Sequence, residues 1–177
     1  MIYRITTGVA ILFESNVFLG VTEAQAQLVQ YWQEKCVQGA LPRREDINPG
    51  SLRSHLAAIS IVEIQNSGDV RFRLAGSGLR SILGQEMRGR SIRDLEPTVC
   101  DMWSLGLSSA IDRGRPCGGL ICRDNDDHAW LRLPLLSETG AALILCHDAL
   151  LPKKRPNNSI KENLSTTVST SFSALVA

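Results

Sequence analysis

The feature that most constrains the fold of this chain is a β-hairpin pattern between residues 56 and 76. Residues 70–76 alternate apolar and basic side chains at a period of two, which predicts that Phe72 and Leu74 face a core while Arg71 and Arg73 face away. The preceding run, residues 56–64, is rich in β-branched residues, and a turn signal at residues 66–69 separates the two runs. We therefore predict two antiparallel strands joined by a tight turn.

The remaining patterns predict helices on either side of this hairpin and three further strands. Apolar residues at three- and four-residue steps indicate an amphipathic helix from Thr22, a capping residue, to Gln38. Short helical patterns near residues 79–83 and 92–95 precede a longer helix from about Pro97 to Arg113. Strands are expected at about residues 117–123, 129–136 and 141–149.

The order of these elements favours an α+β fold with an antiparallel sheet. Strands pair through short turns at both ends of the chain, whereas a parallel sheet needs a crossover helix between successive strands. The helices after the hairpin are segregated to the middle of the chain. We predict an N-terminal helix, a hairpin, a helical segment and a three-stranded closing unit.

Composition limits the domain count and the compartment. A chain of 177 residues with 44% hydrophobic residues, 21% charged residues and a net charge of +1 suits one globular domain and requires neither nucleic acid nor a membrane as partner. Five scattered cysteines suit free thiols in the cytoplasm better than a disulfide framework. The apolar run Val9–Phe13 is shorter than the core of a signal peptide.

We expect three segments along the chain. Residues 1–21 form an extension of uncertain structure, residues 22–151 form the domain, and residues 152–177 form a disordered tail rich in Ser and Thr.

The sequence between Trp32 and Leu95 resembles a bacterial family of stand-alone PAS-like proteins of largely uncharacterised function. Its pattern is a tryptophan-bearing helix followed by the stretches 41–44 (LPRR), 46–49 (DINP), 73–77 (RLAGS) and 83–89 (LGQEMRG). Two positions depart from the family pattern, since Ser77 replaces threonine and Leu83 replaces phenylalanine. The resemblance covers residues 22–151.

The resemblance implies a five-stranded antiparallel sheet with helices across one face, in addition to the N-terminal amphipathic helix. It brings no catalytic residues. By analogy, it implies a sensor or regulatory module in signal transduction, which binds a small apolar or amphipathic ligand, forms a homodimer or acts on a separate signalling protein.

The default ligand site in such a fold is the space between the sheet and the middle helices. Alternation and helical periodicity nominate nine residues as its lining, and the alternative is that they simply fill a close-packed core. These residues are Phe72, Leu74, Leu79, Leu83, Trp103, Leu107, Leu131, Leu133 and Ile144.

A partner interface is a second hypothesis. Leu28, Tyr31 and Trp32 lie on the apolar stripe of the first helix, which either packs on its own domain or forms a dimer contact. Arg43 and Arg44, beside two acidic residues, either pin a loop or contact an anionic partner.

A second set of basic residues lies between residues 71 and 93. Six arginines either form a basic patch for nucleic acid or acidic lipid or lie on a solvated surface, and we expect the second, because no aromatic residues are interleaved with them for stacking on bases. These are Arg71, Arg73, Arg80, Arg88, Arg90 and Arg93.

The alternative function, a haem- or metal-binding protein or a small enzyme, depends on histidines and cysteines whose spacing is weak for a zinc site. No nucleophile motif or phosphate-binding loop is recognised, and the sequence identifies no cofactor. The candidate ligands are His55, Cys117, Cys122, His128, Cys146 and His147.

Overall fold

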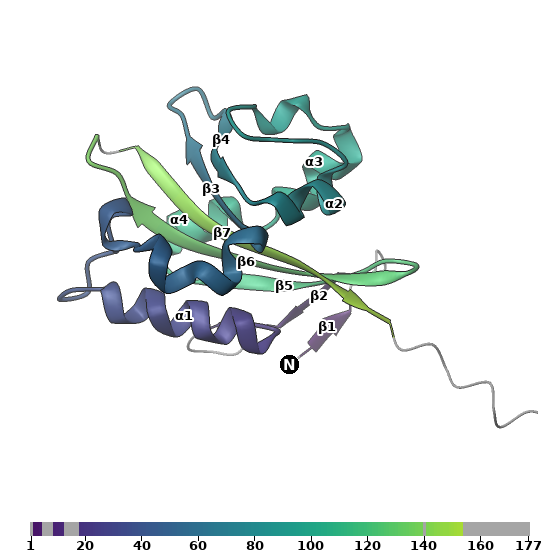
Figure 1. Ribbon diagram of the computed structural model, residues 1–177, viewed down its shortest axis with the longest axis horizontal. Coiled ribbons are helices and arrows are strands. Elements are labelled where there is room, and N and C mark those ends of the chain that lie inside the picture. The colour runs from purple at the N-terminus through teal and green to yellow at the C-terminus, as the bar shows by residue number, and fades with distance from the viewer. Residues whose placement is uncertain (1, 5–8, 13–17, 140, 154–177) are drawn as a thin grey trace, which may run out of the picture.

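The computed structural model describes residues 2–4, 9–12, 18–139 and 141–153, which form one antiparallel sheet with helical segments on both faces (Figure 1). The strand order is β1-β2-β5-β6-β7-β3-β4. The strands are β1 (Ile2–Arg4), β2 (Val9–Leu12), β3 (Ile59–Ile64), β4 (Val70–Ala75), β5 (Cys117–Cys122), β6 (Asp126–Leu136) and β7 (Ala142–Pro152).

The predicted α+β class and the five antiparallel strands β3 to β7 are confirmed. The hairpin β3–β4 pairs through β3 with β7, the last strand, which places the two ends of the domain next to each other in the sheet. Two short strands, β1 and β2, continue the sheet beyond β5. They lie in the segment whose structure the sequence left undetermined, and the expected tail lies outside the described residues from residue 154 onward.

One face of the sheet is covered by the N-terminal helix and by 3-10 turns. These elements are α1 (Glu23–Lys35), η1 (Arg44–Asp46) and η2 (Pro49–Ala58). Thr22 caps α1 as predicted, because its hydroxyl accepts a hydrogen bond from the amide of Gln25 at 3.2 Å. Leu28, Val29 and Trp32 are buried against this face, and the Trp32 indole donates to the carbonyl of Pro134 at 2.8 Å.

The opposite face carries the middle helical segment. Its elements are η3 (Ser77–Leu79), α2 (Arg80–Leu83), η4 (Ile92–Asp94), α3 (Pro97–Trp103) and α4 (Leu107–Arg113). A second buried cluster here joins Val62, Phe72 and Ile144 from the sheet to Leu79 and Trp103 from the helical layer. The sheet therefore has two apolar faces, and the 3-10 segments η1 and η2 join the N-terminal helix on the face opposite the middle helices.

The predicted long helix from Pro97 to Arg113 is two helices. Residues 104–106 interrupt it, and Gly106 has a φ of 80°, which an L side chain rarely adopts. A Cβ at Gly106 would lie 2.3 Å from the Trp130 indole, so the interruption lets the chain approach the sheet closely.

A β-bulge in the hairpin places Phe72 and Leu74 on different faces. Ile61 pairs with Leu74 and Val62 pairs with Phe72, so Arg73 is the extra residue. Phe72 belongs to the cluster under the middle helices, whereas Leu74 packs against the cluster under α1. The strict alternation predicted for residues 70–76 is wrong at this point.

No helix in the described segments is both long and apolar enough to span a membrane.

Candidate functional site: a buried charged cluster

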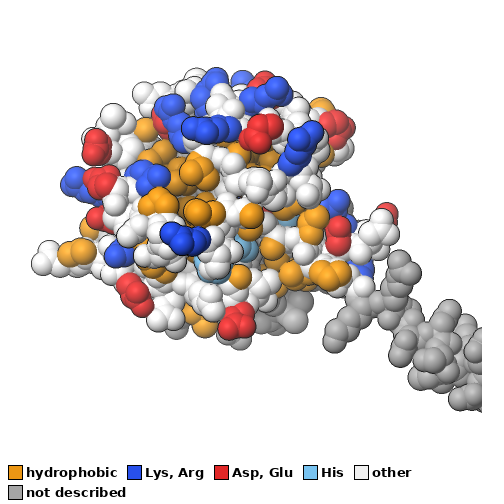
Figure 2. Space-filling model, in the orientation of Figure 1, with side chains coloured by type: hydrophobic (Ala, Val, Ile, Leu, Met, Phe, Trp, Pro, Cys, Tyr) orange, Lys and Arg blue, Asp and Glu red, His pale blue; other side chains and the backbone are white. Residues whose placement is uncertain are grey.

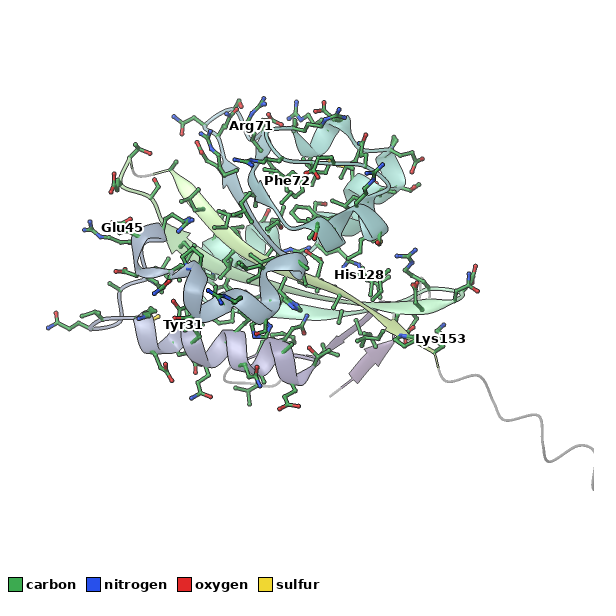
Figure 3. All side chains as sticks on the ribbon, in the orientation of Figure 1. Tyr31, Glu45, Arg71, Phe72, His128 and Lys153 are labelled. Carbon is green, nitrogen blue, oxygen red and sulfur yellow. The ribbon has the colours of Figure 1, made fainter. Side chains whose placement is uncertain are left out.

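Three ionisable side chains lie together on the face of the sheet that the middle helices cover. His128 and Arg132 come from β6 and Asp148 from β7, and all three side chains are fully buried. Residues 128 and 132 share a face because side chains on a strand alternate, and Asp148 is on the adjacent strand. We call these three residues the charged cluster; His128 is labelled in Figure 3.

Asp148 is the centre of the charged cluster. Its carboxylate accepts hydrogen bonds from Arg132 Nη1 at 3.1 and 3.2 Å and lies 2.9 Å from His128 Nε2. The Trp103 indole donates to the same carboxylate at 3.1 Å. The buried charge is therefore paired and hydrogen-bonded on several sides, as a buried carboxylate requires.

The charged cluster joins the sheet to the helical layer through Trp103, the last residue of α3. Arg132 Nη2 donates to the backbone carbonyl of Trp103 at 2.8 Å, and the guanidinium lies 4.6 Å from the centre of the Trp103 ring. A helix end leaves its last carbonyls without partners inside the helix, and Arg132 satisfies one of them from the sheet. Arg132 and Asp148 thus fix the C-terminal end of α3.

The electrostatics favour a charged Arg132–Asp148 pair. Burial raises the pKa of Asp148, but the positive charge of Arg132 and the hydrogen bond with His128 outweigh burial and hold this pKa below its ordinary value. Burial lowers the pKa of Arg132, and the charge of Asp148 reverses this effect. Because the two charges cancel, the pair adds no net charge to the interior.

Several polar atoms near this cluster have no hydrogen-bond partner among the described residues. They are Arg132 Nε, His128 Nδ1 and Trp130 Nε1, and all three lie on residues of the same face of β6. The Trp130 ring centre lies 5.5 Å from the Arg132 guanidinium carbon. Buried polar atoms without partners are few in native proteins, and each calls for water or another group to satisfy it.

The arrangement lacks the geometry of nucleophilic catalysis. His128 and Asp148 resemble a base with its orienting acid, but no described hydroxyl or thiol bonds to His128 Nδ1. Burial raises the pKa of Cys117 to about 11 and that of Cys146 to about 12, so both thiols are protonated at neutral pH.

The structure divides the nine predicted pocket residues between the two faces. Phe72, Leu79, Leu83, Trp103, Leu107 and Ile144 belong to the cluster under the middle helices. Leu131 and Leu133 belong to the cluster under α1, and Leu74 packs against that cluster. The grouping of these last three with Phe72 is wrong, because the sheet buries both its faces and the bulge reverses the orientation of Leu74.

The predicted interface residues also separate into two groups. Leu28 and Trp32 are 1% and 5% exposed, and they pack on the chain's own sheet. Tyr31 is half-buried, and its hydroxyl accepts a hydrogen bond from the amide of Asn48 at 2.8 Å. A partner interface stays a prediction, and in this fold it can directly use only Tyr31, Arg43 and Arg44.

The loop that carries Arg43 and Arg44 is held by local bonds. Asp46 accepts from the backbone amide of Arg43 at 2.7 Å rather than from a guanidinium. Arg44 donates to the carbonyl of Ile47 at 3.4 Å, and Arg43 lies 3.8 Å from Glu45. Both arginines therefore belong to a loop whose conformation is held by local hydrogen bonds, and the Arg43 side chain is exposed.

The described residues contain no group of three or more His, Cys, Asp or Glu side chains arranged to hold a metal ion. His55 and His147 lie with ring centres 6.1 Å apart on the α1 face, away from His128. Cys146 faces the other side from His147, as their adjacent positions on a strand predict.

Arg132 and Asp148 are the residues of this site that sequence reasoning missed. The sequence did contain a signal, since Arg132 is the one charged residue of the predicted strand 129–136 and Asp148 is the one acidic residue of the predicted strand 141–149. A charge at such a position is seldom fully buried unless it is paired. Two isolated opposite charges on adjacent buried strands therefore predict an ion pair between the strands.

Comparisons with known proteins place this geometry in context. A family model described as a PAS domain matches residues 21–99. No curated protein matches the sequence. A solved structure entitled "The light state structure of the blue-light photoreceptor Aureochrome1 LOV" is 15% identical, covering 67% of this chain and 96% of that chain with a TM-score of 0.35. At that TM-score the similarity carries no argument about the fold, which rests on the strand order described above.

Proposed function

We propose, from the match of a PAS-domain family model to residues 21–99, that this chain contains a PAS-like domain and is a non-catalytic sensory or regulatory module of signal transduction that responds to a small ligand or a protein partner. We place it in the cytoplasm, as the free cysteines and the composition suggest.

The charged cluster is the observation that carries this proposal. Arg132 and Asp148 connect β6 and β7 to the end of α3 through Trp103. A ligand or a packing change that competes for either side chain would alter the position of the helical layer relative to the sheet. A buried pair held by several hydrogen bonds has discrete arrangements, which a regulatory element needs.

A small amphipathic molecule suits this side of the sheet. Phe72 and Trp103 are in contact, with ring centres 4.6 Å apart, and Leu79 and Leu107 are buried in the same cluster, so a ligand would enter by separating these side chains. The unsatisfied nitrogens of Arg132 and Trp130 supply polar contacts at one end. Ligand sites combine such apolar walls with a few oriented polar groups.

Native mass spectrometry of the purified chain, together with its absorption spectrum, tests the proposal. The double variant Arg132→Met/Asp148→Leu removes both members of the ion pair in the charged cluster together, so neither is left as an unpaired buried charge. Leu131→Met is the control, because it changes the adjacent residue on the opposite face of β6. We expect a co-purifying small molecule on the wild type and on the control, and its loss from the double variant.

Spectra that show the bare chain mass for all three proteins contradict sensing by a retained ligand. Equal retention by all three proteins contradicts the assignment of the charged cluster as the ligand-contacting site.

A protein partner is the second form of input or output. Val37 and Leu136 are exposed beside the loop that carries Arg43, and the amide of Leu136 donates to the carbonyl of Pro42 at 2.9 Å. Val37 and Leu136 are not among the predicted interface residues, and they extend the accessible part of that interface, which is Tyr31, Arg43 and Arg44. Sedimentation equilibrium of the wild type and of Val37→Ser tests self-association: we expect a dimer that the variant weakens, and a monomeric wild type excludes it.

A further inference from the structure

We propose that Arg71, Arg88, Arg90 and Arg93 form one surface, here called the arginine face, that docks an acidic segment of a protein partner. The proposal deepens the regulatory function above by assigning the chemistry of a partner, and it depends on that function only for its purpose. Figure 2 shows basic side chains along the upper edge of the molecule with fewer acidic ones between them, at the end where Figure 3 labels Arg71.

Contacts join these four arginines into one surface. Arg71 Nη1 donates to the carbonyl of Gly89 at 3.0 Å, between Arg88 and Arg90. Arg71 also pairs with Ser91 across a β-bridge, and both Arg71 and Arg93 lie within 3.8 Å of Asp69. The arginines of β4 and of the following segment therefore lie side by side, although the first and the last are 22 positions apart in the sequence.

The nearby acidic side chains are occupied by the loop itself. Asp69 accepts from the Ser91 hydroxyl, and Asp94 accepts from the Ser91 amide at 3.2 Å. Glu86 accepts from the amides of Met87 and Arg88 at 3.1 and 3.0 Å. These carboxylates stabilise turns, while Arg88 and Arg90 are exposed and have no ion pair among the described residues.

The result is a local excess of positive charge. Residues 69–94 contain six of the 19 basic residues of the chain but three of its 18 acidic residues, although the whole chain carries a net charge of only +1. An excess of this kind attracts an anionic partner and accelerates its association.

The chemistry of the surface favours carboxylates of a protein over nucleic acid or lipid. The aromatic residue of this segment, Phe72, is buried, so no ring is available to stack on a base. The large hydrophobic residues exposed in the described chain are Leu19, Val37, Leu56 and Leu136, all outside residues 69–93, so none would insert into a bilayer here. Guanidiniums bind carboxylates through paired hydrogen bonds.

Fluorescence anisotropy with a fluorescein-labelled oligo-glutamate peptide tests the arginine face. The variant is Arg88→Glu/Arg90→Glu, which leaves Arg71 and its loop contacts intact. The matched control is Arg53→Glu/Arg115→Glu, which makes the same change in net charge at two exposed residues outside the arginine face. We expect the first variant to weaken peptide binding at least about tenfold, or about 1.4 kcal/mol, and the control to weaken it less than about twofold.

Three results would overturn the proposal. The first is no saturable binding of the peptide by the wild type, and the second is an equal loss in both variants, which would reflect net charge alone. The third is tighter binding of duplex DNA or of phosphatidylserine vesicles than of the peptide at about 0.15 M salt. Because this assay does not involve the interior, its failure is distinct from the absence of a retained small ligand.

Discussion

At the scale of single residues, Asp148 has the largest electrostatic role in the described interior. It neutralises Arg132 and also accepts hydrogen bonds from Trp103 and His128. Its position could have been predicted from the isolated charges in β6 and β7. The hydrogen bond from Arg132 to the Trp103 carbonyl could not have been predicted. It requires α3 to end at Trp103, whereas the apolar periodicity of the sequence continues through residues 104–106 and predicts one helix.

Replacing Asp148 by Asn tests the pairing. The variant keeps the volume but leaves Arg132 charged and buried without a counter-ion, so we expect the free energy of unfolding to fall by about 3–5 kcal/mol. The double variant Arg132→Met/Asp148→Leu should lose less, because both charges are removed together. Urea denaturation measures both values, and a loss below about 1 kcal/mol for Asp148→Asn would contradict a buried ion pair.

His147 predicts a dependence of stability on pH. Burial lowers the pKa of His147 from 6.5 to about 4; the adjacent Asp148 opposes this shift, while His55 and Arg132 add to it. The unfolded chain therefore binds a proton more readily than the folded chain between pH 6.5 and 4. We expect His147 to cost up to about 3 kcal/mol of stability as the pH falls through this window.

Urea midpoints at several pH values, compared between the wild type and His147→Gln, isolate this contribution. Parallel curves for the two proteins between pH 6.5 and 4 would show that His147 does not titrate as its burial predicts.

At the scale of elements, the junction between α3 and α4 is the tightest contact between the helical layer and the sheet. Gly106 and Gly84 have similar positive φ values of 80° and 76°, but only Gly106 faces neighbours, with the Trp130 ring 2.3 Å from a built Cβ. Alanine at Gly84 adds backbone strain alone, about 1–2 kcal/mol. Alanine at Gly106 adds a steric clash with Trp130 to this strain. We therefore expect Gly106→Ala to lower the free energy of unfolding by about 1–3 kcal/mol more than Gly84→Ala does.

Thermal unfolding of the two alanine variants gives the comparison. Equal losses would mean that Trp130 moves aside without cost and that the junction is not closely packed.

The elements also show where sequence patterns succeed and fail. The first strand of the hairpin begins at Ile59 rather than Leu56, because residues 56–58 end the 3-10 turn whose carbonyls lie against Gly76. The Thr22 cap depends on a local hydrogen bond and was predicted, as were five strands. The face to which α1 binds depends on long-range contacts such as that of Trp32 with Pro134, which no local pattern contains.

At the scale of the whole molecule, one sheet supports two separate apolar layers. Trp32 reports on the layer under α1, while Trp103 and Trp130 lie on the other side. Because β3, β6 and β7 supply side chains to both layers, loss of either layer exposes strands that the other needs. We expect the layers to unfold together, as small domains usually do.

Two variants separate the tryptophan fluorescence of the two layers. Trp32→Phe leaves Trp103 and Trp130 on the side of the middle helices, and Trp103→Phe/Trp130→Phe leaves Trp32 under α1. Within each variant, the urea transition by tryptophan fluorescence should coincide with that by far-ultraviolet circular dichroism. An earlier fluorescence transition in the second variant would mean that α1 detaches from a folded sheet.

The extra residue at Arg73 has a consequence for comparing this chain with its relatives. In β4, Phe72 faces the middle helices, and Leu74, two residues later, faces α1 instead of the same layer. A relative that lacks the extra residue would have a regular strand here, with its counterparts of Phe72 and Leu74 adjacent in sequence and still on opposite faces of the sheet. A one-residue gap at this position therefore leaves the lining of the interior unchanged, whereas an alignment that omits the gap would compare residues from opposite sides of the sheet.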